Sequence, residues 1–301
     1  MIRVAHIVNP VKVKENSDLF TGQPITFASI LNAKQQSKMN ALISLYTTQY
    51  EEDRSIIPAG FNILSNLERS VLDVNKKLQG KKLPLIGDIL SKLKDAEASD
   101  YIIFTNMDIA LMPHFYDAVF AYLEKGHDAL VINRRRLSHT YSTVEELPLM
   151  YSDMGKSHPG FDCFVFKTEL LEKFILDDIC VGISFLEATL VHNIFSFAEN
   201  PLYIPDAHLT FHIGMDVLVP RNNAFYHHNR RCFFDKIQPQ LKPHFELKKF
   251  PYNSLPMPKR ALKWILNPSL FTRNYLQLEG KNLFQRTKAR LDEIRWRILQ
   301  R

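Results

Sequence analysis

Two oxygen-bearing side chains, Asn106 and Asp108, directly follow Tyr101–Thr105, a run apolar enough to form a buried β-strand. Ligands of open α/β sheets bind beyond the carboxyl ends of the strands, so both residues stand where a site is expected. An amide carbonyl and a carboxylate spaced one residue apart can both face a hard cation, which would in turn hold a diphosphate. The alternative is that both residues stabilise a turn and the helix after it.

Three consecutive arginines, Arg134, Arg135 and Arg136, follow a second predicted strand at 129–133. A guanidinium group binds phosphate or carboxylate in a bidentate way, so we expect Arg134 and Arg135 to contribute to binding a phosphate-bearing ligand. The alternative, for at least two of the three, is an ordinary solvated position on a loop.

Two carboxylates stand beside apolar segments. Asp162 is the charged residue near the start of the otherwise apolar run Phe161–Phe166, and its alternative is a place at the margin of a turn formed by Pro159 and Gly160. Glu187 shares a predicted helical face with apolar residues, a setting that raises the pKa of a carboxyl group towards that of a general base. Its spacing from Ser184 is also that of a capping box, which is its structural alternative.

The segment HLTFHIGMD alternates as a strand does, so His208, Thr210 and His212 are expected on one face. Two imidazoles beside a candidate cation site favour a ligand role for both histidines. The alternative is that each is a hydrogen-bonded polar group of the core.

Short β-rich runs alternate with helical patterns, which predicts an α/β fold with a mainly parallel sheet flanked by helices. The pattern ends near residue 225, where prolines become frequent. The predicted strands are Val4–Val8, Ala41–Tyr46, Tyr101–Thr105, Ala129–Asn133 and Phe161–Phe166. The predicted helices are Thr26–Lys38, Leu83–Glu97, one between Pro113 and Gly126, and Thr168–Ile175 with Thr168 as its cap.

Several motifs with a known mechanism are absent from the sequence. No GxGxxG follows the first strand, and neither GxxxxGK[ST] nor GxSxG occurs. These absences argue against a dinucleotide-binding dehydrogenase, a P-loop kinase or ATPase, and a serine hydrolase of the GxSxG type.

The segment TNMDI resembles the DxD element of GT-A glycosyltransferases, here in the form NxD. The blocks LPLIGDIL, VINRRRL, HPGFDCFVF and HLTFHIGMD are similar to further landmarks of bacterial members, so the resemblance covers about residues 2–220. It implies a GT-A-like, Rossmann-like fold and a nucleotide-sugar donor. It also implies a divalent cation, Mn²⁺ or Mg²⁺, although the loss of one carboxylate weakens the binding of a hard cation.

The same resemblance implies roles for individual residues. Asn106 and Asp108 would hold the cation, a histidine would join them, Asp162 would lie where the acceptor binds, and Glu187 would be the base that deprotonates the acceptor hydroxyl. The implied activity is sugar transfer to a glycan or lipid-linked acceptor, in assembly of a bacterial surface glycan. The alternatives are a nucleotidyltransferase or similar nucleotide-sugar enzyme, and a binding or scaffold protein with a degraded motif.

Charge is unevenly distributed along the chain. Residues 230–301 carry 17 Lys/Arg against 5 Asp/Glu, whereas the chain as a whole has a net charge of only +6. We therefore expect a GT-A-like domain over residues 1–225 and a basic, proline-containing and helical extension over 226–301. The stretch 282–301 reads as an amphipathic helix for an anionic membrane surface or, alternatively, for the protein's own core or a second subunit in a homo-oligomer.

Composition also indicates the cellular compartment in which the protein is expected. The three cysteines, Cys163, Cys180 and Cys232, form no CxxC pair, and two of them have apolar neighbours, which favours buried thiols in a reducing compartment. No secretion signal or membrane-spanning run is visible. We expect a cytoplasmic protein, peripheral at the inner membrane face, without a nucleic-acid reader motif.

Overall fold

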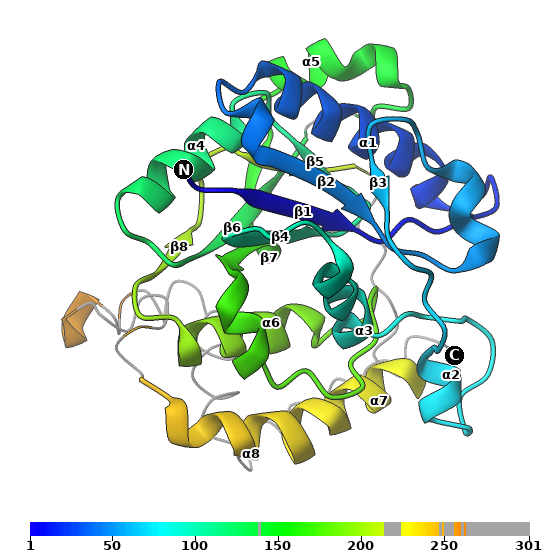
Figure 1. Cartoon of the computed structure of the whole chain (residues 1–301), viewed down its shortest axis with the longest axis vertical. Coiled ribbons are helices and arrows are strands. Elements are labelled where there is room, and N and C mark those ends of the chain that lie inside the picture. The colour runs from blue at the N-terminus through cyan, green and yellow to red at the C-terminus, as the bar shows by residue number, and fades with distance from the viewer. Residues whose placement is uncertain (138–139, 214–223, 247–248, 250–255, 260–261, 263–301) are drawn as a thin grey trace.

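The computed structural model describes residues 1–137, 140–213, 224–246, 249, 256–259 and 262, without the side chains of Asp95, Pro159 and Gly160. These residues form one nine-stranded sheet covered by helices on both faces (Figure 1). The expected α/β class is therefore confirmed. The strands are β1 Val4–Val8, β2 Ile43–Thr47, β3 Asn62–Ile63, β4 Tyr101–Thr105, β5 Ile109–Leu111, β6 Ala129–Arg136, β7 Lys156–Lys167, β8 Pro201–Ile204 and β9 Thr210–His212.

The helices differ widely in length. The α-helices are α1 Asp18–Gln36, α2 Val71–Val74, α3 Ile86–Ser91, α4 Phe115–Glu124, α5 Leu147–Ser152, α6 Leu186–Phe197, α7 Ala224–Arg231 and α8 Gln238–Leu241. Short 3₁₀ turns cover Asn40–Leu42, Glu51–Ile56, Lys92–Asp95, Val144–Glu146, Thr168–Lys173 and Lys242–His244, and a π-helical turn covers Cys232–Ile237. No described helix is both long and apolar enough to cross a membrane.

One half of the sheet is parallel. In this half β1 pairs with β2 and β4, and β2 pairs with β3, all in parallel register. All five residues of β1 and of β4 are buried, as expected for strands covered on both faces. Strong apolar runs thus reproduce the predicted bounds of β1 and β4, whereas β2 begins two residues later than expected.

The other half is mixed. Strand β7 inserts antiparallel between β4 and β6, while β6 pairs in parallel first with β8 and then with β9. The ladder between β6 and β7 shifts register around Asn133, so β6 can change partners along its length. Its last residues, Arg134–Arg136, extend the predicted strand and lie in the sheet.

Helices α1 and α4 cover one face of the sheet, and α3, α6, α7 and α8 cover the other (Figure 1). Residues 232–241 contribute to the same core as β1 and β4, through Phe233, Ile237 and Leu241. This segment falls within the expected basic extension but packs on the body. The boundary at residue 225 itself stays a prediction, and the expected helix over 282–301 lies outside the described residues.

Four local predictions are corrected by the structure. Helix α1 begins at Asp18 and continues through Pro24, and the helix expected over 83–97 is reduced to α3 and a 3₁₀ turn. Thr168 caps no helix, because its hydroxyl donates to Ser99 O at 2.7 Å, and only a 3₁₀ turn follows it. The N-cap of α6 is Phe185, without a side-chain cap bond, and not Ser184, which the capping-box alternative for Glu187 required.

Candidate functional site

The loop after β4 is a tight turn that leads straight into another strand. Ile109 N donates to Asn106 O at 3.2 Å, and Ile213 N donates to Asp108 O at 3.0 Å. Strand β5 therefore starts immediately after Asp108, and α4 has His114 as its N-cap without any side-chain cap bond. Asn106 and Asp108 do not cap this helix, so the alternative that they stabilise the following helix is wrong.

Asp108 contacts His212 across the antiparallel pair of β5 and β9. The register places Ile109 opposite His212, and His212 Nε2 lies 3.1 Å from Asp108 Oδ2. The Asp108 side chain is 33% exposed, whereas that of His212 is 9% exposed. Two residues 104 positions apart in sequence thus form one pair, with the carboxylate on its accessible side.

A second, deeper pair lies beside the first. Asp162 accepts a hydrogen bond from the Arg134 guanidinium, and their side chains are 5% and 14% exposed. Burial raises the pKa of the Asp162 carboxyl, Arg134 opposes this shift, and the charge of Asp108 adds to it. Because Asp108 and His212 both act on Asp162, the two pairs form one cluster of four ionisable groups.

Several buried polar atoms in this region have no hydrogen-bond partner within the described part of the chain. They are Asn106 Oδ1, Asp162 Oδ2 and His212 Nδ1. An unpaired buried polar atom costs free energy, so such atoms are expected where a ligand completes the site. Their oxygens, with that of Asp108, have the chemistry that Mg²⁺ or Mn²⁺ prefers.

The fit to a divalent cation is nevertheless incomplete on protein ligands alone. Among the described residues, no group of three or more His, Cys, Asp or Glu side chains is arranged to hold a metal ion. Asp108 and His212, with the amide oxygen of Asn106, could hold a cation whose other ligands are diphosphate oxygens or water. This is the coordination that Mg²⁺ commonly adopts with phosphate substrates.

His208 and Arg135 lie in a different environment. His208 precedes β9 on a bend with φ of +50°, so the expected alternation with His212 does not reach it. Burial lowers the pKa of His208, and Arg135 and His114 lower it further. Arg135 pairs with Asp206 at 3.5 Å rather than with the cluster around Asp108. Adjacent strand residues point to opposite faces, which explains why Arg134 and Arg135 diverge.

Glu187 stands in the first turn of α6, two residues after the N-cap Phe185. Its side chain is half-buried, and α6 packs against β7, the strand that carries Asp162. The structure thus places Glu187 on the face of the sheet covered by α6. Its role as a base stays a prediction.

Gln23 and Asp53, which were not among the residues predicted from the sequence, form a polar clamp at the carboxyl ends of β1 and β2. Gln23 of α1 accepts from Val11 N at 2.9 Å and donates to Val11 O at 2.7 Å, and Asp53 accepts from Lys12 N at 2.7 Å. Asp53 is only 3% exposed, and burial raises the pKa of its carboxyl. The signal available in the sequence was the polar stretch that directly follows each of these strands.

Comparison with known proteins gives fold-level similarity only. No protein-family model and no curated protein matches the chain. Among solved structures, S. aureus TarS 1–349 in complex with UDP-GlcNAc is 12% identical, with 92% of this chain and 91% of that one covered, at a TM-score of 0.46.

Glucosyl-3-phosphoglycerate synthase from Mycobacterium tuberculosis, in complex with Mn²⁺, UDP and glucosyl-3-phosphoglycerate, is also 12% identical. The match covers 78% of this chain and 80% of that one, at a TM-score of 0.47. TM-scores below 0.5 at such identities say nothing about which residues of this chain are functional.

Proposed function

We propose that the chain is a glycosyltransferase that moves a sugar from a nucleotide-sugar to an acceptor hydroxyl. The observation that carries the proposal is the cluster of Asp108, His212, Asp162 and Arg134 at the carboxyl end of β4. Asp108 offers a partly accessible carboxylate, Asn106 and Asp162 each carry a buried oxygen without a partner among the described residues, and the charge of Asp108 acts on Asp162. This arrangement suits a ligand that carries both phosphate groups and a hard cation.

Asp108, His212 and Asn106 would hold a divalent cation together with the donor diphosphate. The cation, when bound, offsets the negative charge that develops on the departing nucleoside diphosphate. Of the similar structures, one is a complex with UDP-GlcNAc and the other a complex with Mn²⁺, UDP and glucosyl-3-phosphoglycerate. For this chain we propose Mn²⁺ or Mg²⁺ as the cofactor.

The clamped loop after β1 would form the nucleoside side of the donor site. Strands β1 and β4 are neighbours, so their carboxyl ends present this loop and Asp108 at the same edge of the sheet. Asp53 and Gln23 each bond the loop backbone and thereby fix its path before a donor arrives. A preformed loop reduces the entropy that donor binding must offset.

Arg134 would bind the donor or the acceptor, and Glu187 would act on the acceptor. Asp162 holds the Arg134 guanidinium in one orientation, in which it can donate to an oxygen of the donor or of the acceptor. Glu187 would take the proton of the acceptor hydroxyl, which is the task of a general base in an inverting transfer. We propose a glycan or lipid-linked acceptor, with surface-glycan assembly and a peripheral membrane location as the setting.

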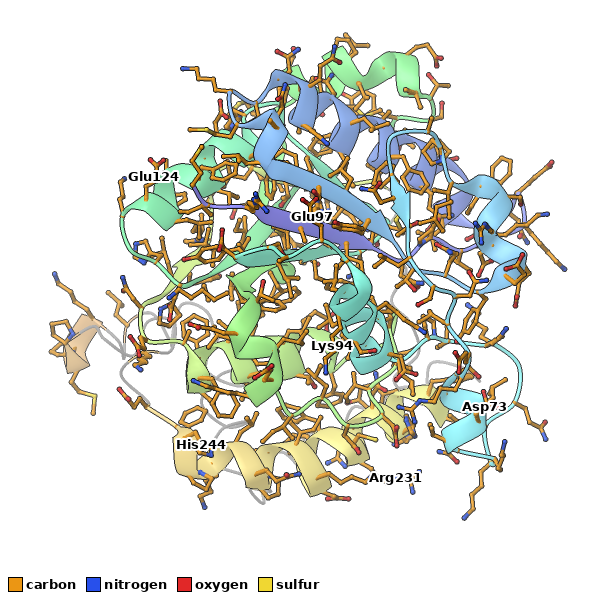
Figure 2. All side chains as sticks on the ribbon, viewed as in Figure 1. Asp73, Lys94, Glu97, Glu124, Arg231 and His244 are labelled. Atoms are coloured by element: carbon orange, nitrogen blue, oxygen red, sulfur yellow. The ribbon has the colours of Figure 1, made fainter. Side chains whose placement is uncertain are left out.

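The proposal is tested by calorimetric titration of UDP-GlcNAc and UDP-glucose with and without Mn²⁺, and by the rate of UDP release with water as the acceptor of the sugar. Asp108→Ala should abolish the Mn²⁺-dependent part of binding while the thermal unfolding midpoint changes little. Glu124→Ala is the matched control, because Glu124 is an exposed carboxylate on α4 at the surface of the molecule (Figure 2). Unchanged binding by the Asp108 variant would contradict the assignment.

A donor-binding protein without transfer activity is the second candidate. The observation that favours it is Asn106, which stands where the DxD element has a carboxylate; in the part of the chain that the structure describes, no three acidic, histidine or cysteine side chains are arranged to hold a metal. The two candidates differ in one measurement. A transferase releases UDP in repeated turnovers, whereas a binding protein shows donor affinity and no UDP release.

A further inference from the structure

Phe185, the N-cap of α6, has a backbone conformation that its residue type rarely adopts. Its φ is +83° and its ψ is −9°, in the left-handed region. For a residue with a Cβ this region brings Cβ close to the following carbonyl oxygen, which is why glycine normally occupies it. A bulky side chain at such a position persists only where the surroundings hold it there, and such positions cluster at functional sites.

The surroundings that hold Phe185 come from the C-terminal helices. Its ring centroid lies 5.5 Å from that of Tyr226 in α7 and 5.6 Å from those of Phe233 and Phe234 in the π-helical turn. The side chain is 9% exposed, so the ring is packed inside the protein. Residues some 40 to 50 positions later in the chain therefore fix the conformation at the start of α6.

The backbone of Phe185 in turn sets the first turn of α6. Its carbonyl oxygen accepts from Thr189 N at 3.0 Å and from Thr189 Oγ1 at 2.7 Å. Residues 186–188 lie between Phe185 and Thr189, so their positions depend on the direction that the backbone takes at Phe185. Glu187 is the middle one of the three.

Helix α7 also holds the segment that leads to Phe185. Asn229 is fully buried, accepts from Cys180 N at 2.9 Å and donates to Cys180 O at 2.9 Å. The same amide group lies 3.2 Å from Ser184 O. The segment 180–185 is thus fixed along its length by side chains of one later segment, 226–234.

We propose that Phe185 is a positioning residue for Glu187. The left-handed backbone at Phe185, held by the rings of Tyr226, Phe233 and Phe234, sets the place of the α6 carboxylate on the acceptor side. The role of Glu187 in this inference rests on the proposed transferase function. The C-terminal helices, although distant in sequence from the cluster around Asp108, thereby become part of the acceptor half of the site.

The test compares glycine with alanine at two positions of the same aromatic cluster. Phe185→Gly and Phe185→Ala both remove the ring, but only glycine adopts a positive φ without a steric cost. Phe234→Gly and Phe234→Ala are the matched controls, because Phe234 lies in a helical turn where glycine is the less stable choice. The readouts are the thermal midpoint, amide hydrogen exchange of residues 186–190, and kcat and KM for Mn²⁺-dependent UDP release from UDP-GlcNAc.

At position 185 we expect glycine to unfold about 2–4 °C above alanine, and at position 234 we expect the reverse order. Alanine at 185, but not glycine, should raise the exchange rates over residues 186–190. The kcat of Phe185→Gly should exceed that of Phe185→Ala by on the order of tenfold, with equal KM for the donor. If Phe185→Ala does not fold, Phe185→Asn is compared with Phe185→Leu instead. The asparagine variant should then have the higher thermal midpoint, since Asn adopts positive φ more readily.

Three outcomes would overturn the inference. If alanine equals or exceeds glycine in stability at position 185, the left-handed backbone does not govern the start of α6. If the stability order holds while kcat is equal in both variants, Phe185 serves only packing. A wild-type protein that releases no UDP contradicts the proposed function and with it the role of Glu187, whereas the exchange pattern still reports separately on whether Phe185 positions α6.

Discussion

The buried titratable groups of the two halves of the sheet differ in their hydrogen bonding, although Thr47 and Gln49 of the parallel half also carry a buried oxygen without a partner among the described residues. In the parallel half, His6 of β1 is bonded to Tyr116 Oη at 2.7 Å and to Thr105 Oγ1 at 2.9 Å, and Gln23 and Asp53 bond the backbone of the loop after β1. In the mixed half, Asp162 Oδ2 and His212 Nδ1 are buried without a partner among the described residues. Satisfied polar groups hold a framework in place, whereas unsatisfied ones mark where a ligand is expected.

The largest effect should come from breaking the deep ion pair of the mixed half. Asp162→Ala takes the buried carboxylate away from Arg134, and losing one partner of a buried pair costs about 3–5 kcal/mol of unfolding free energy. Asp206→Ala is the control, since it removes the 43%-exposed partner of Arg135 and should cost less than about 1 kcal/mol. Denaturant unfolding measures both, and similar losses would contradict the contrast between the two pairs.

The second effect concerns pH and the parallel half. Burial lowers the pKa of His6 to about 3 from 6.5, so the folded state binds fewer protons at this residue than the unfolded state does. The part of the unfolding free energy that depends on a neutral His6 is therefore fully present above pH 6.5. It is lost as pH falls towards 3, at up to about 1.4 kcal/mol per pH unit. His6→Gln should flatten the stability profile between pH 6 and 4, as followed by urea unfolding. An unchanged slope would show that His6 is not the group responsible.

A third effect separates two glycines of positive φ. A Cβ at Gly155 would lie 2.2 Å from Arg136 O, where β7 begins beside the end of β6, whereas a Cβ at Gly126 meets nothing within 4 Å. Gly126→Ala should cost about 1–2 kcal/mol for the backbone conformation alone. Gly155→Ala should cost more, because the backbone around Arg136 must also move. Equal thermal midpoints for the two variants would contradict the close approach of β6 and β7.

The smallest effect bears on the cation. Asn106→Asp adds a carboxylate to the turn that carries Asp108, and affinity for a hard cation rises with the charge of its ligands. Mn²⁺ should then bind on the order of tenfold more tightly in calorimetric titrations, equal to about 1.4 kcal/mol. Glu124→Gln is a suitable control for nonspecific charge. Unchanged Mn²⁺ affinity would place Asn106 outside the cation site.

Local sequence patterns predicted the parallel half of the sheet better than the mixed half. Continuous apolar runs marked β1 and β4 because both strands are buried on both faces. The antiparallel insertion of β7 leaves no local signal, since pairing depends on residues far away in sequence. The same holds for Phe185, whose conformation is set by rings some 40 residues later.

The candidate site was predicted unevenly for the same reason. Its polar residue types stood out after strands, and Asp108 and His212 do come together. His208 was grouped with them from strand alternation and Arg135 from its place after a predicted strand, but the bend at His208 and the alternation along β6 separate them from the cluster. Sequence spacing gives the face of a strand only while the strand continues, and β9 begins at Thr210.

The shared core of β1 and residues 232–241 has a consequence for synthesis on the ribosome. Ala5 and Ile7 emerge first, yet they pack in one core with Phe233, Ile237 and Leu241, which emerge more than 200 residues later. Until then the aromatic side chains around α6 have no cover, and such surfaces make nascent chains prone to association. Release of the chain with residues 1–213 alone should therefore yield an aggregating fragment, and chaperone contact during translation should persist until residue 241 has left the ribosome.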